Sequence, residues 1–147
     1  MIISSIGQLN KLDRDKLYYL ASPYTAKGLT GHAKRQLEHD RYLTITHIGV
    51  VLFAEHGLLL LTPITASHGM AMHDPTNKLG GNWEQFAALD TKQITQSDGG
   101  IIVAMMPGWK ESTGVTAEIQ HAKALGKPIY YLEPRLVIGV KNAVRTK

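Results

Sequence analysis

The strongest constraint on the fold is the alternation of short apolar runs with longer segments of helical periodicity. Four short runs are rich in Leu, Ile, Val and Tyr and are flanked by Gly, Pro or Ser: Lys16–Ala21, Leu58–Leu61, Gly100–Met105 and Ile129–Leu132. Between them, apolar residues recur at spacings of three and four, as on one face of a helix, in Ala33–Glu55, Trp83–Gln96 and Gly114–Leu125. Strands that alternate with helices form right-handed βαβ units.

We therefore predict one α/β domain over residues 1–147. It is a doubly wound parallel sheet of the flavodoxin-like or Rossmann-like kind, with four to five strands and helices on both faces. The continuously apolar run Leu58–Leu61 is typical of a strand covered on both sides. Residues 1–15 and 133–147 are expected to be peripheral, and Leu136–Val140 forms either a short edge strand or part of a loose tail.

The segment Pro63–Asn82 interrupts the alternation. It contains two prolines, several glycines and two histidines, so we expect a long loop with at most a short helix. Loops of this length in a compact domain are usually functional or mobile. Asn82, at its end, is a good N-cap for the helix that begins at Trp83.

The composition excludes several classes of protein. The chain contains no cysteine, so it has no disulfide, no thiolate nucleophile and no zinc–cysteine site. No apolar run reaches the roughly 18 residues that a membrane span needs, and the first residues lack the pattern of a secretory signal. We expect a cytoplasmic protein with no membrane partner.

The formal net charge of +4 does not indicate a nucleic-acid polymer as the partner. Much of the excess lies near the end of the chain, at Arg135, Lys141, Arg145 and Lys147. A nucleic-acid surface usually has a basic stripe interleaved with aromatic residues, and the sequence has none. The charge is better suited to attracting a small substrate that carries phosphate.

The loops at one edge of the predicted sheet are the candidates for a binding site. In a doubly wound sheet, ligands bind beyond the carboxyl ends of the strands, near the point where the strand order reverses. The loops that follow the first three strands are Ser22–Thr25, Thr62–His68 and Met106–Gly114. Polar residues are concentrated in these loops, so we predict that they form the site.

Glu118 carries the clearest chemical prediction. It lies in the first turns of the helix Gly114–Leu125, one turn from the apolar residues Val115 and Ala122. A carboxylate directed toward the interior is costly unless it is hydrogen-bonded or used. The helix N-terminus favours its ionised form, as a nucleophile requires. The alternative is a surface glutamate that complements the helix dipole.

Three further side chains accompany Glu118. Asp90 lies on the apolar face of the helix Trp83–Gln96, Tyr24 follows the first strand, and Arg41 interrupts an apolar helical stripe. Taken singly, each has an alternative role: a surface acid, a packing residue, and an arginine that extends to the rim of the core. Taken together, they favour an active site.

Four segments occur in a recognisable order along residues 17–132. They are Leu20-Ala-Ser-Pro-Tyr24, Asp90 with Asp98 eight residues later, Ser112-x-Gly114-x-x-x-Glu118, and Gly126-Lys-Pro-Ile129. This order resembles the nucleoside 2-deoxyribosyltransferase superfamily, which includes the 2-deoxynucleoside 5-monophosphate N-glycosidases. The segment Pro107–Ser112, together with Ser67-His68, resembles an uncharacterised prokaryotic and phage branch of it, a DUF1937-like domain of unknown function.

The resemblance implies a covalent, two-step glycosyl transfer. Glu118 would attack the anomeric carbon of a nucleoside or nucleotide, Asp90 would help to protonate the departing base, and Tyr24 would hold the Glu118 carboxylate. Water or a second base would then take the sugar from the enzyme, as in retaining glycosidases.

The resemblance also favours a 5-phosphorylated substrate. Transferases of the superfamily tend to have an aspartate six residues before the nucleophile, where this chain has Ser112, as the monophosphate hydrolases do. A serine at a helix N-terminus donates to a phosphate oxygen without charge repulsion. Arg41 is expected to add a charge-assisted bond. Further residues expected to bind the substrate are Ser22, His68, Trp109 and Gly114.

We therefore predict an N-glycosidase that needs no metal and no cofactor. His68, His73 and Asp74 match no zinc signature, and no Gly-x-Gly-x-x-Gly follows the first strand. Two alternatives remain on the same fold: a deoxyribosyltransferase that exchanges bases, and a non-catalytic nucleotide sensor. A related phosphoribohydrolase fits less well, because Gly114 is not followed by threonine. The resemblance further implies a homodimer or larger homo-oligomer.

Overall fold

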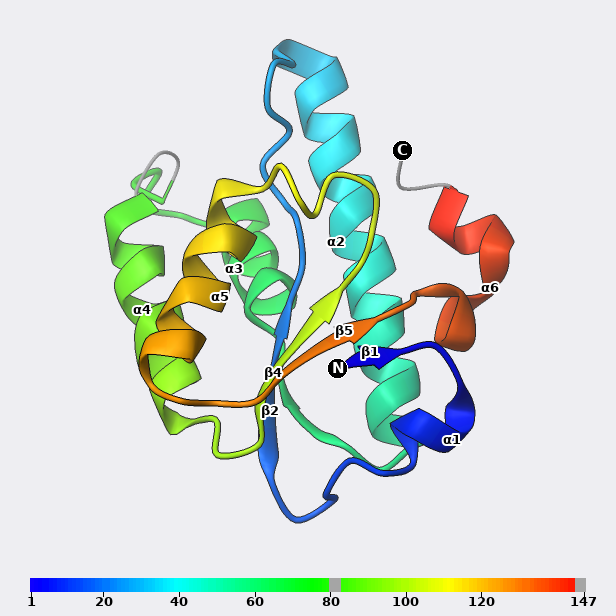
Figure 1. Cartoon of the computed structure of the whole chain (residues 1–147). Helices are drawn as coiled ribbons and strands as arrows, with labels where there is room; N and C mark the ends of the chain where they lie inside the picture. The colour runs from blue at the N-terminus through cyan, green and yellow to red at the C-terminus, as the bar shows by residue number, and fades with distance from the viewer. Residues whose placement is uncertain (80–82, 145–147) are drawn as a thin grey trace.

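The computed structural model describes residues 1–79 and 83–144, which form one five-stranded parallel sheet with helices on both faces (Figure 1). The strands are β1 (Ile2–Ile3), β2 (Leu17–Ala21), β3 (Leu59–Leu61), β4 (Gly100–Ala104) and β5 (Ile129–Leu132). The helices are α1 (Ile6–Leu9), α2 (Gly31–Ala54), α3 (Pro63–Met72), α4 (Trp83–Gln96), α5 (Thr113–Ala124) and α6 (Arg135–Val144). The predicted doubly wound α/β fold is confirmed.

The order of the strands reverses at β2. The sheet order is β1-β5-β4-β2-β3, and all the pairs are parallel. From β2 the chain crosses to β3 at one edge, then returns past β2 to β4 and continues to β5. The loops after β2 and β4 therefore leave the same edge of the sheet beside each other, and they leave a crevice of the kind that binds ligands.

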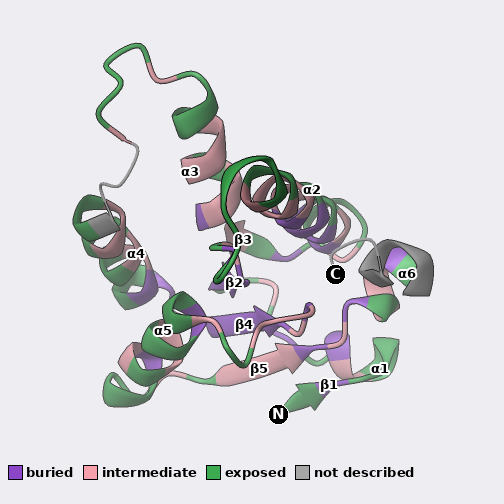
Figure 2. Cartoon of the chain, turned by 90° about the horizontal axis from the view of Figure 1, so that it is seen from above, coloured by how far each residue is buried: buried purple, intermediate pink, exposed green. Residues whose placement is uncertain are grey.

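The alternation of side chains along β2 builds a separate core on each face of the sheet. On one face, Leu20 packs in a cluster with Ile45 and Ile48 of α2. On the other face, Tyr19 and Ala21 pack in a cluster with residues of α4 and α5. Helices thus cover both faces of the centre of the sheet, and β4 is buried along its whole length (Figure 2).

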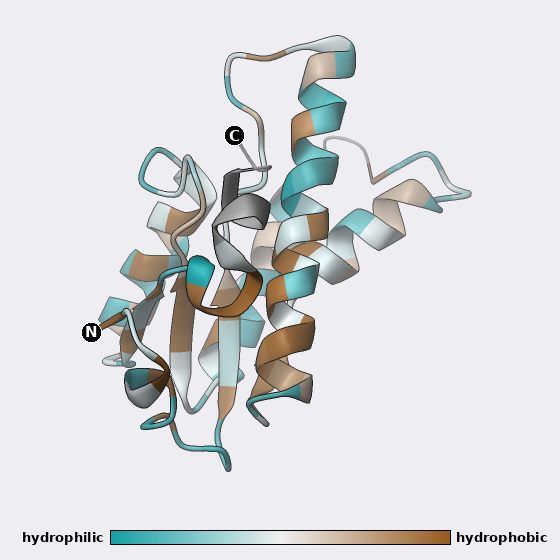
Figure 3. Ribbon diagram, turned by 90° about the vertical axis from the view of Figure 1, so that its right-hand side faces the viewer, coloured by the Kyte–Doolittle hydropathy of each residue, from teal (hydrophilic) through white to brown (hydrophobic). Residues whose placement is uncertain are grey.

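The two halves of α2 have different environments. Its C-terminal half carries the buried residues that cover the sheet. Its N-terminal half, before Arg41, is polar and rises above the edge at which β2 ends (Figure 3). The helix begins at Gly31, two residues before its predicted start. Its polar half therefore stands beside the crevice.

Both edges of the sheet differ from the prediction. The strand in Leu58–Leu61 is an edge strand, with Leu59 45% exposed, so it is not covered on both sides. Leu136–Val140 lies in α6 and is neither an edge strand nor a loose tail. Its place at the sheet edge is taken by β1, which pairs with β5. The first residues of the chain are thus part of the sheet.

The segment Pro63–Asn82 contains more helix than predicted. The ten-residue α3 occupies its first half, with Pro63 in the first turn, where the missing N–H costs little. After α3, the Asp74 carboxylate accepts hydrogen bonds from the N–H groups of Thr76 and Leu79. The proposed N-cap, Asn82, lies outside the described residues.

Gly100→Ala is expected to destabilise the fold strongly. Gly100 begins β4 with a φ of +97°, and a Cβ atom there would overlap the carbonyl oxygen of Pro128. Strain and overlap together should lower the free energy of unfolding by about 3 kcal/mol or more. Gly126→Ala is the matched control, because its φ is also positive, at +68°, and no described atom lies within 4 Å of the added Cβ. It should cost about 1 kcal/mol. Urea denaturation measures both losses, and equal losses would contradict the role of the Pro128 contact.

Candidate active site

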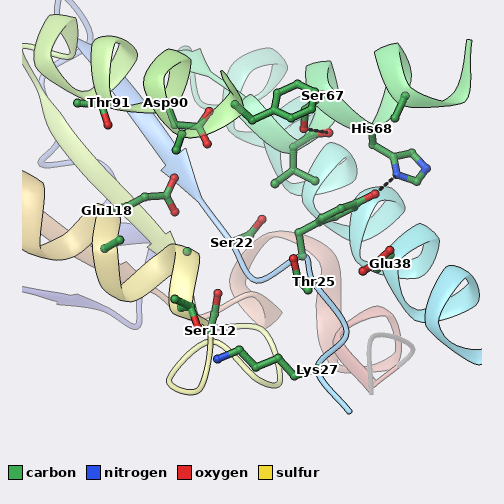
Figure 4. A pocket seen from close by; sticks show the side chains of 18 of the residues that line it. Ser22, Thr25, Lys27, Glu38, Ser67, His68, Asp90, Thr91, Ser112 and Glu118 are labelled. Carbon is green, nitrogen blue, oxygen red and sulfur yellow. Dashed lines mark hydrogen bonds between the residues drawn. The ribbon is translucent and has the colours of Figure 1, made fainter. Parts of the chain in front are cut away.

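A cavity of about 730 Å³ lies over the crevice between β2 and β4 (Figure 4). Its walls come from the loop after β2, the N-terminal parts of α2 and α5, and the helices α3 and α4. The volume is typical of a small-molecule site. The predicted site residues that line it are Ser22, Tyr24, His68, Asp90, Ser112, Gly114 and Glu118. The fold thus brings most of the predicted residues together.

Arg41 and Trp109 are not among the described residues that line the cavity. Arg41 is buried, and its guanidinium donates hydrogen bonds to the carbonyl oxygens of Thr25 and Pro107 at 2.9 and 3.4 Å. It therefore ties the loop after β2 to the loop after β4, whereas we expected it to reach the substrate. Trp109 packs against Tyr131, with the ring centroids 5.6 Å apart.

Tyr19, rather than Tyr24, holds the Glu118 carboxylate. The Tyr19 hydroxyl donates a hydrogen bond to Glu118 Oε2, whereas the Tyr24 hydroxyl contacts His68. This corrects the role expected for Tyr24. The reason is that successive side chains of β2 point to opposite faces, and Tyr19 lies on the face that α5 covers. Burial, followed by the nearby Glu118 charge, raises the pKa of Tyr19, so its hydroxyl stays protonated.

Asp90 and Glu118 are neighbouring carboxyl groups on α4 and α5 (Figure 4). Burial raises the pKa of Asp90 to about 6 and the pKa of Glu118 to about 8. The Tyr19 hydroxyl lowers both pKa values in part, and the Asp90 charge adds to the rise at Glu118. We expected the helix N-terminus to keep Glu118 ionised. However, Glu118 lies in the second turn of α5, where burial outweighs the helix dipole. The pair therefore retains a proton near neutral pH.

The N-terminus of α5 forms a polar end of the cavity. Ser112 is the N-cap, and its hydroxyl accepts a hydrogen bond from the Val115 N–H at 3.2 Å. Lys27 approaches the same loop, where its Nζ donates to the Glu111 carbonyl at 2.7 Å. The Ser22 hydroxyl is buried and has no hydrogen-bond partner among the described residues, although Ser22 lines the cavity. A helix N-terminus, an ammonium group and an unpaired hydroxyl suit an anion.

A second polar cluster lies on the wall formed by α2 and α3. Tyr24 Oη is 2.7 Å from His68 Nδ1, and His39 Nδ1 is 3.2 Å from His68 Nε2. The Tyr42 ring stacks on His68, with centroids 4.3 Å apart. Burial raises the pKa of Tyr24 to about 12 and lowers the pKa of His68. Both groups are therefore neutral at pH 7, and the negative charge at this wall comes from Glu38.

Four functional side chains of the site are not among the predicted site residues. Lys27, Lys34 and Glu38 line the cavity, and Tyr19 contacts it through its hydrogen bond to Glu118. Tyr19 could be found from the sequence, because a tyrosine on a buried strand needs a partner for its hydroxyl. Lys34 and Glu38 give no such signal, since charges at positions i and i+4 of a helix usually form a solvated surface pair. The fold alone turns them toward the cavity.

Two other kinds of site are not found within residues 1–79 and 83–144. No group of three or more His, Cys, Asp or Glu side chains there is arranged to hold a metal ion. In the same part of the chain, none of the helices combines the length and the apolar character needed to cross a lipid bilayer.

Comparison with known proteins identifies the family of this chain. Residues 16–133 match a family described as "Domain of unknown function (DUF1937)". The match covers most of the chain, so the protein belongs to this family. None of the curated proteins matches the sequence.

The raised pKa of Glu118 is expected to reduce stability as the pH rises from about 5 to 8. In this window the folded state holds a proton that an exposed glutamate in the unfolded state has lost, so the contribution of Glu118 to stability decreases with rising pH. Glu118→Gln removes this effect. It should increase the free energy of unfolding by about 1 to 3 kcal/mol at pH 8 and change it little at pH 5.

Urea denaturation at the two pH values measures this difference. Glu55→Gln, which removes an exposed carboxylate at the end of α2, is the control for the loss of one charge. If Glu118→Gln and wild type differ equally at both pH values, the Glu118 proton is not held by burial.

Proposed function

We propose that this member of the DUF1937 family hydrolyses the N-glycosidic bond of a nucleoside 5-monophosphate, or of a nucleoside, through a covalent glycosyl–Glu118 intermediate. The observation that carries the proposal is the carboxyl pair Asp90 and Glu118, which retains a proton in a cavity of nucleotide size. Retaining glycosidases use two neighbouring carboxyl groups, one as the nucleophile and one as the acid and base.

In the first step, a carboxylate oxygen of Glu118 bonds to the anomeric carbon while the bond from that carbon to the base nitrogen breaks. The electron pair of the broken bond goes to the base, and Asp90 donates a proton to it. With pKa values of about 8 for Glu118 and about 6 for Asp90, the proton of the pair resides mainly on Glu118 before the substrate binds. The reaction therefore requires that this proton pass to Asp90 as the Glu118 carboxylate engages the anomeric carbon. The hydrogen bond from Tyr19 stabilises negative charge on Glu118, which favours the ionised nucleophile.

In the second step, water takes the place of the base. Asp90, now a carboxylate, accepts a proton from the water as the water oxygen bonds to the anomeric carbon. The bond between the sugar and Glu118 breaks, and both carboxyl groups return to their starting states. Attack by a second base would give base exchange, so the same residues also suit a transferase.

We assign the 5-phosphate to the N-terminus of α5. Ser112 and the first N–H groups of the helix face this end of the cavity, and Lys27 supplies a positive charge. The buried Ser22 hydroxyl lacks a partner among the described residues, and a phosphate oxygen would accept its hydrogen bond. Arg41 supports this end from behind, because it orders both loops that carry these groups.

Base release is expected from wild type and not from Glu118→Gln. A panel of ribo- and deoxyribonucleosides and their 5-monophosphates would be incubated with each protein, with and without an acceptor base, and free base would be measured by chromatography. The substitution should lower kcat by roughly a thousandfold or more, because the amide is a poor nucleophile. Glu55→Gln is the matched control and should keep full activity.

The outcomes of this experiment separate the candidate functions. Base exchange with the acceptor would make the protein a transferase. Tight nucleotide binding without base release would support the sensor and overturn the N-glycosidase.

Ser22→Ala is expected to raise KM for a monophosphate about five- to tenfold and to leave KM for the matching nucleoside unchanged. The Ser22 hydroxyl makes no hydrogen bond within the described residues, so its removal should not lower stability. Steady-state kinetics with the substrate pair, together with urea denaturation, checks both statements. Equal effects on the two substrates would remove Ser22 from the phosphate site.

A further inference from the structure

An ion pair lines the cavity on the wall that α2 forms. Lys34 Nζ lies 2.6 Å from Glu38 Oε2, and both residues line the cavity. The Glu38 side chain is only 13% exposed, whereas the Lys34 side chain is 41% exposed. A solvated pair at positions i and i+4 of a helix contributes little and is exposed on both sides. Glu38 is instead held in the cavity wall, where a ligand can contact it.

The position of the Glu38 carboxylate is fixed before a ligand binds. Its Oε2 accepts a hydrogen bond from the Ala26 N–H at 3.1 Å in addition to the bond from Lys34. Its Oε1 has no hydrogen bond to the described residues, so it remains available as an acceptor. The pair thus offers a ligand one charged donor and one charged acceptor, next to each other.

Two other polar groups of this wall, Tyr24 and His68, line the cavity. Tyr24 and His68 share a hydrogen bond, and neither carries a charge at pH 7. The negative charge of Glu38 makes the wall unsuitable for a phosphate. Glu38 and Glu118 lie on different walls of the cavity, on helices that cover opposite faces of the sheet (Figure 4). The same cavity reaches from Glu118 to Lys34 and Glu38, so a base attached to a sugar at Glu118 has room to extend toward α2.

We propose that the Lys34–Glu38 pair is the subsite for the far edge of the leaving base, and that it selects bases with a lactam edge, a carbonyl next to a ring N–H. This inference rests on the proposed N-glycosidase function. Guanine, hypoxanthine and uracil have such an edge, whereas adenine and cytosine have an amino group next to an unprotonated ring nitrogen.

The charges of the pair favour the lactam edge over the amino edge. Lys34 donates to the carbonyl oxygen, and Glu38 Oε1 accepts the ring N–H. A lactam carbonyl is a stronger acceptor than a ring nitrogen, and a lactam N–H is more acidic than an amino group, so both charge-assisted bonds are stronger. Guanine adds a second N–H donor for Glu38. A site built for these donors and acceptors rejects a base that presents them in exchanged positions.

The test compares kcat/KM within two pairs of monophosphates whose bases differ only at this edge. The pairs are deoxyinosine monophosphate with deoxyadenosine monophosphate, and deoxyuridine monophosphate with deoxycytidine monophosphate. Wild type is expected to favour the lactam member of each pair at least about tenfold. Glu38→Gln and Lys34→Met should each reduce this preference to less than about threefold, because each removes one charged partner. Glu38→Gln retains an oxygen for the Ala26 N–H, so the fold is expected to be kept, and a thermal melt checks this.

Two variants on the same helix are the controls. Asp40→Asn removes one negative charge from α2 and Arg35→Met removes one positive charge. Neither residue is among the described residues that line the cavity, so both variants should keep the wild-type preference.

Two outcomes would show that the subsite is wrong while the N-glycosidase stands. Either wild type releases bases but favours the amino members, or neither Glu38→Gln nor Lys34→Met changes the preference. If no base is released, calorimetry with inosine and adenosine monophosphates decides. Tighter binding of inosine monophosphate that Glu38→Gln removes would support the subsite alone, and equal binding would overturn it.

Discussion

The parallel pairing of β2 with β4 is the constraint on which the candidate site depends. Tyr19 and Ala21 of β2 are in register with Ile101 and Val103 of β4, so the two strands end at the same edge of the sheet. The chain leaves β2 for α2 on one face and leaves β4 for α5 on the other. The polar N-terminal parts of both helices therefore rise on opposite sides of one crevice, and no local preference of either helix would bring them together.

The chemistry of the site follows from placing charge where water is scarce. Asp90 and Glu118 lie between helices packed on the same face of the sheet, and burial makes their ionised forms costly. The Tyr19 hydroxyl offsets part of this cost with a hydrogen bond. At the α2 wall the negative charge is paired instead, because Glu38 accepts hydrogen bonds from the Lys34 ammonium group and from the Ala26 N–H. One cavity thus holds a proton-retaining acid pair at one wall and an ion pair at another.

Most of the fold could be predicted from the sequence, because its signals are local. The runs Lys16–Ala21 and Ile129–Leu132 contain strands, and Trp83–Gln96 is a helix with the expected limits. The errors concern the edges of the sheet, where pairing partners come from distant residues. Leu136–Val140 is apolar enough for a strand, but Ile2–Ile3 pairs with β5 and occupies that edge. The apolar character of a segment indicates that it is buried, but it does not indicate which other segment it packs against.

The sequence by itself determined which loops meet at the candidate site and placed Glu118 beside them, since the ends of parallel strands and the N-termini of the following helices share one edge. Asp90 was expected there from the apolar face of its own helix and from the family resemblance, and it lines the same cavity. Only the tertiary structure decided which way the side chains point. In the structure, the Tyr19 hydroxyl donates a hydrogen bond to Glu118, and the Arg41 guanidinium bonds the loop after β2 without lining the cavity. Glu38 lines the cavity. The physical reason is that periodicity places a residue on a face of its own helix or strand, whereas its partner depends on what packs against that face.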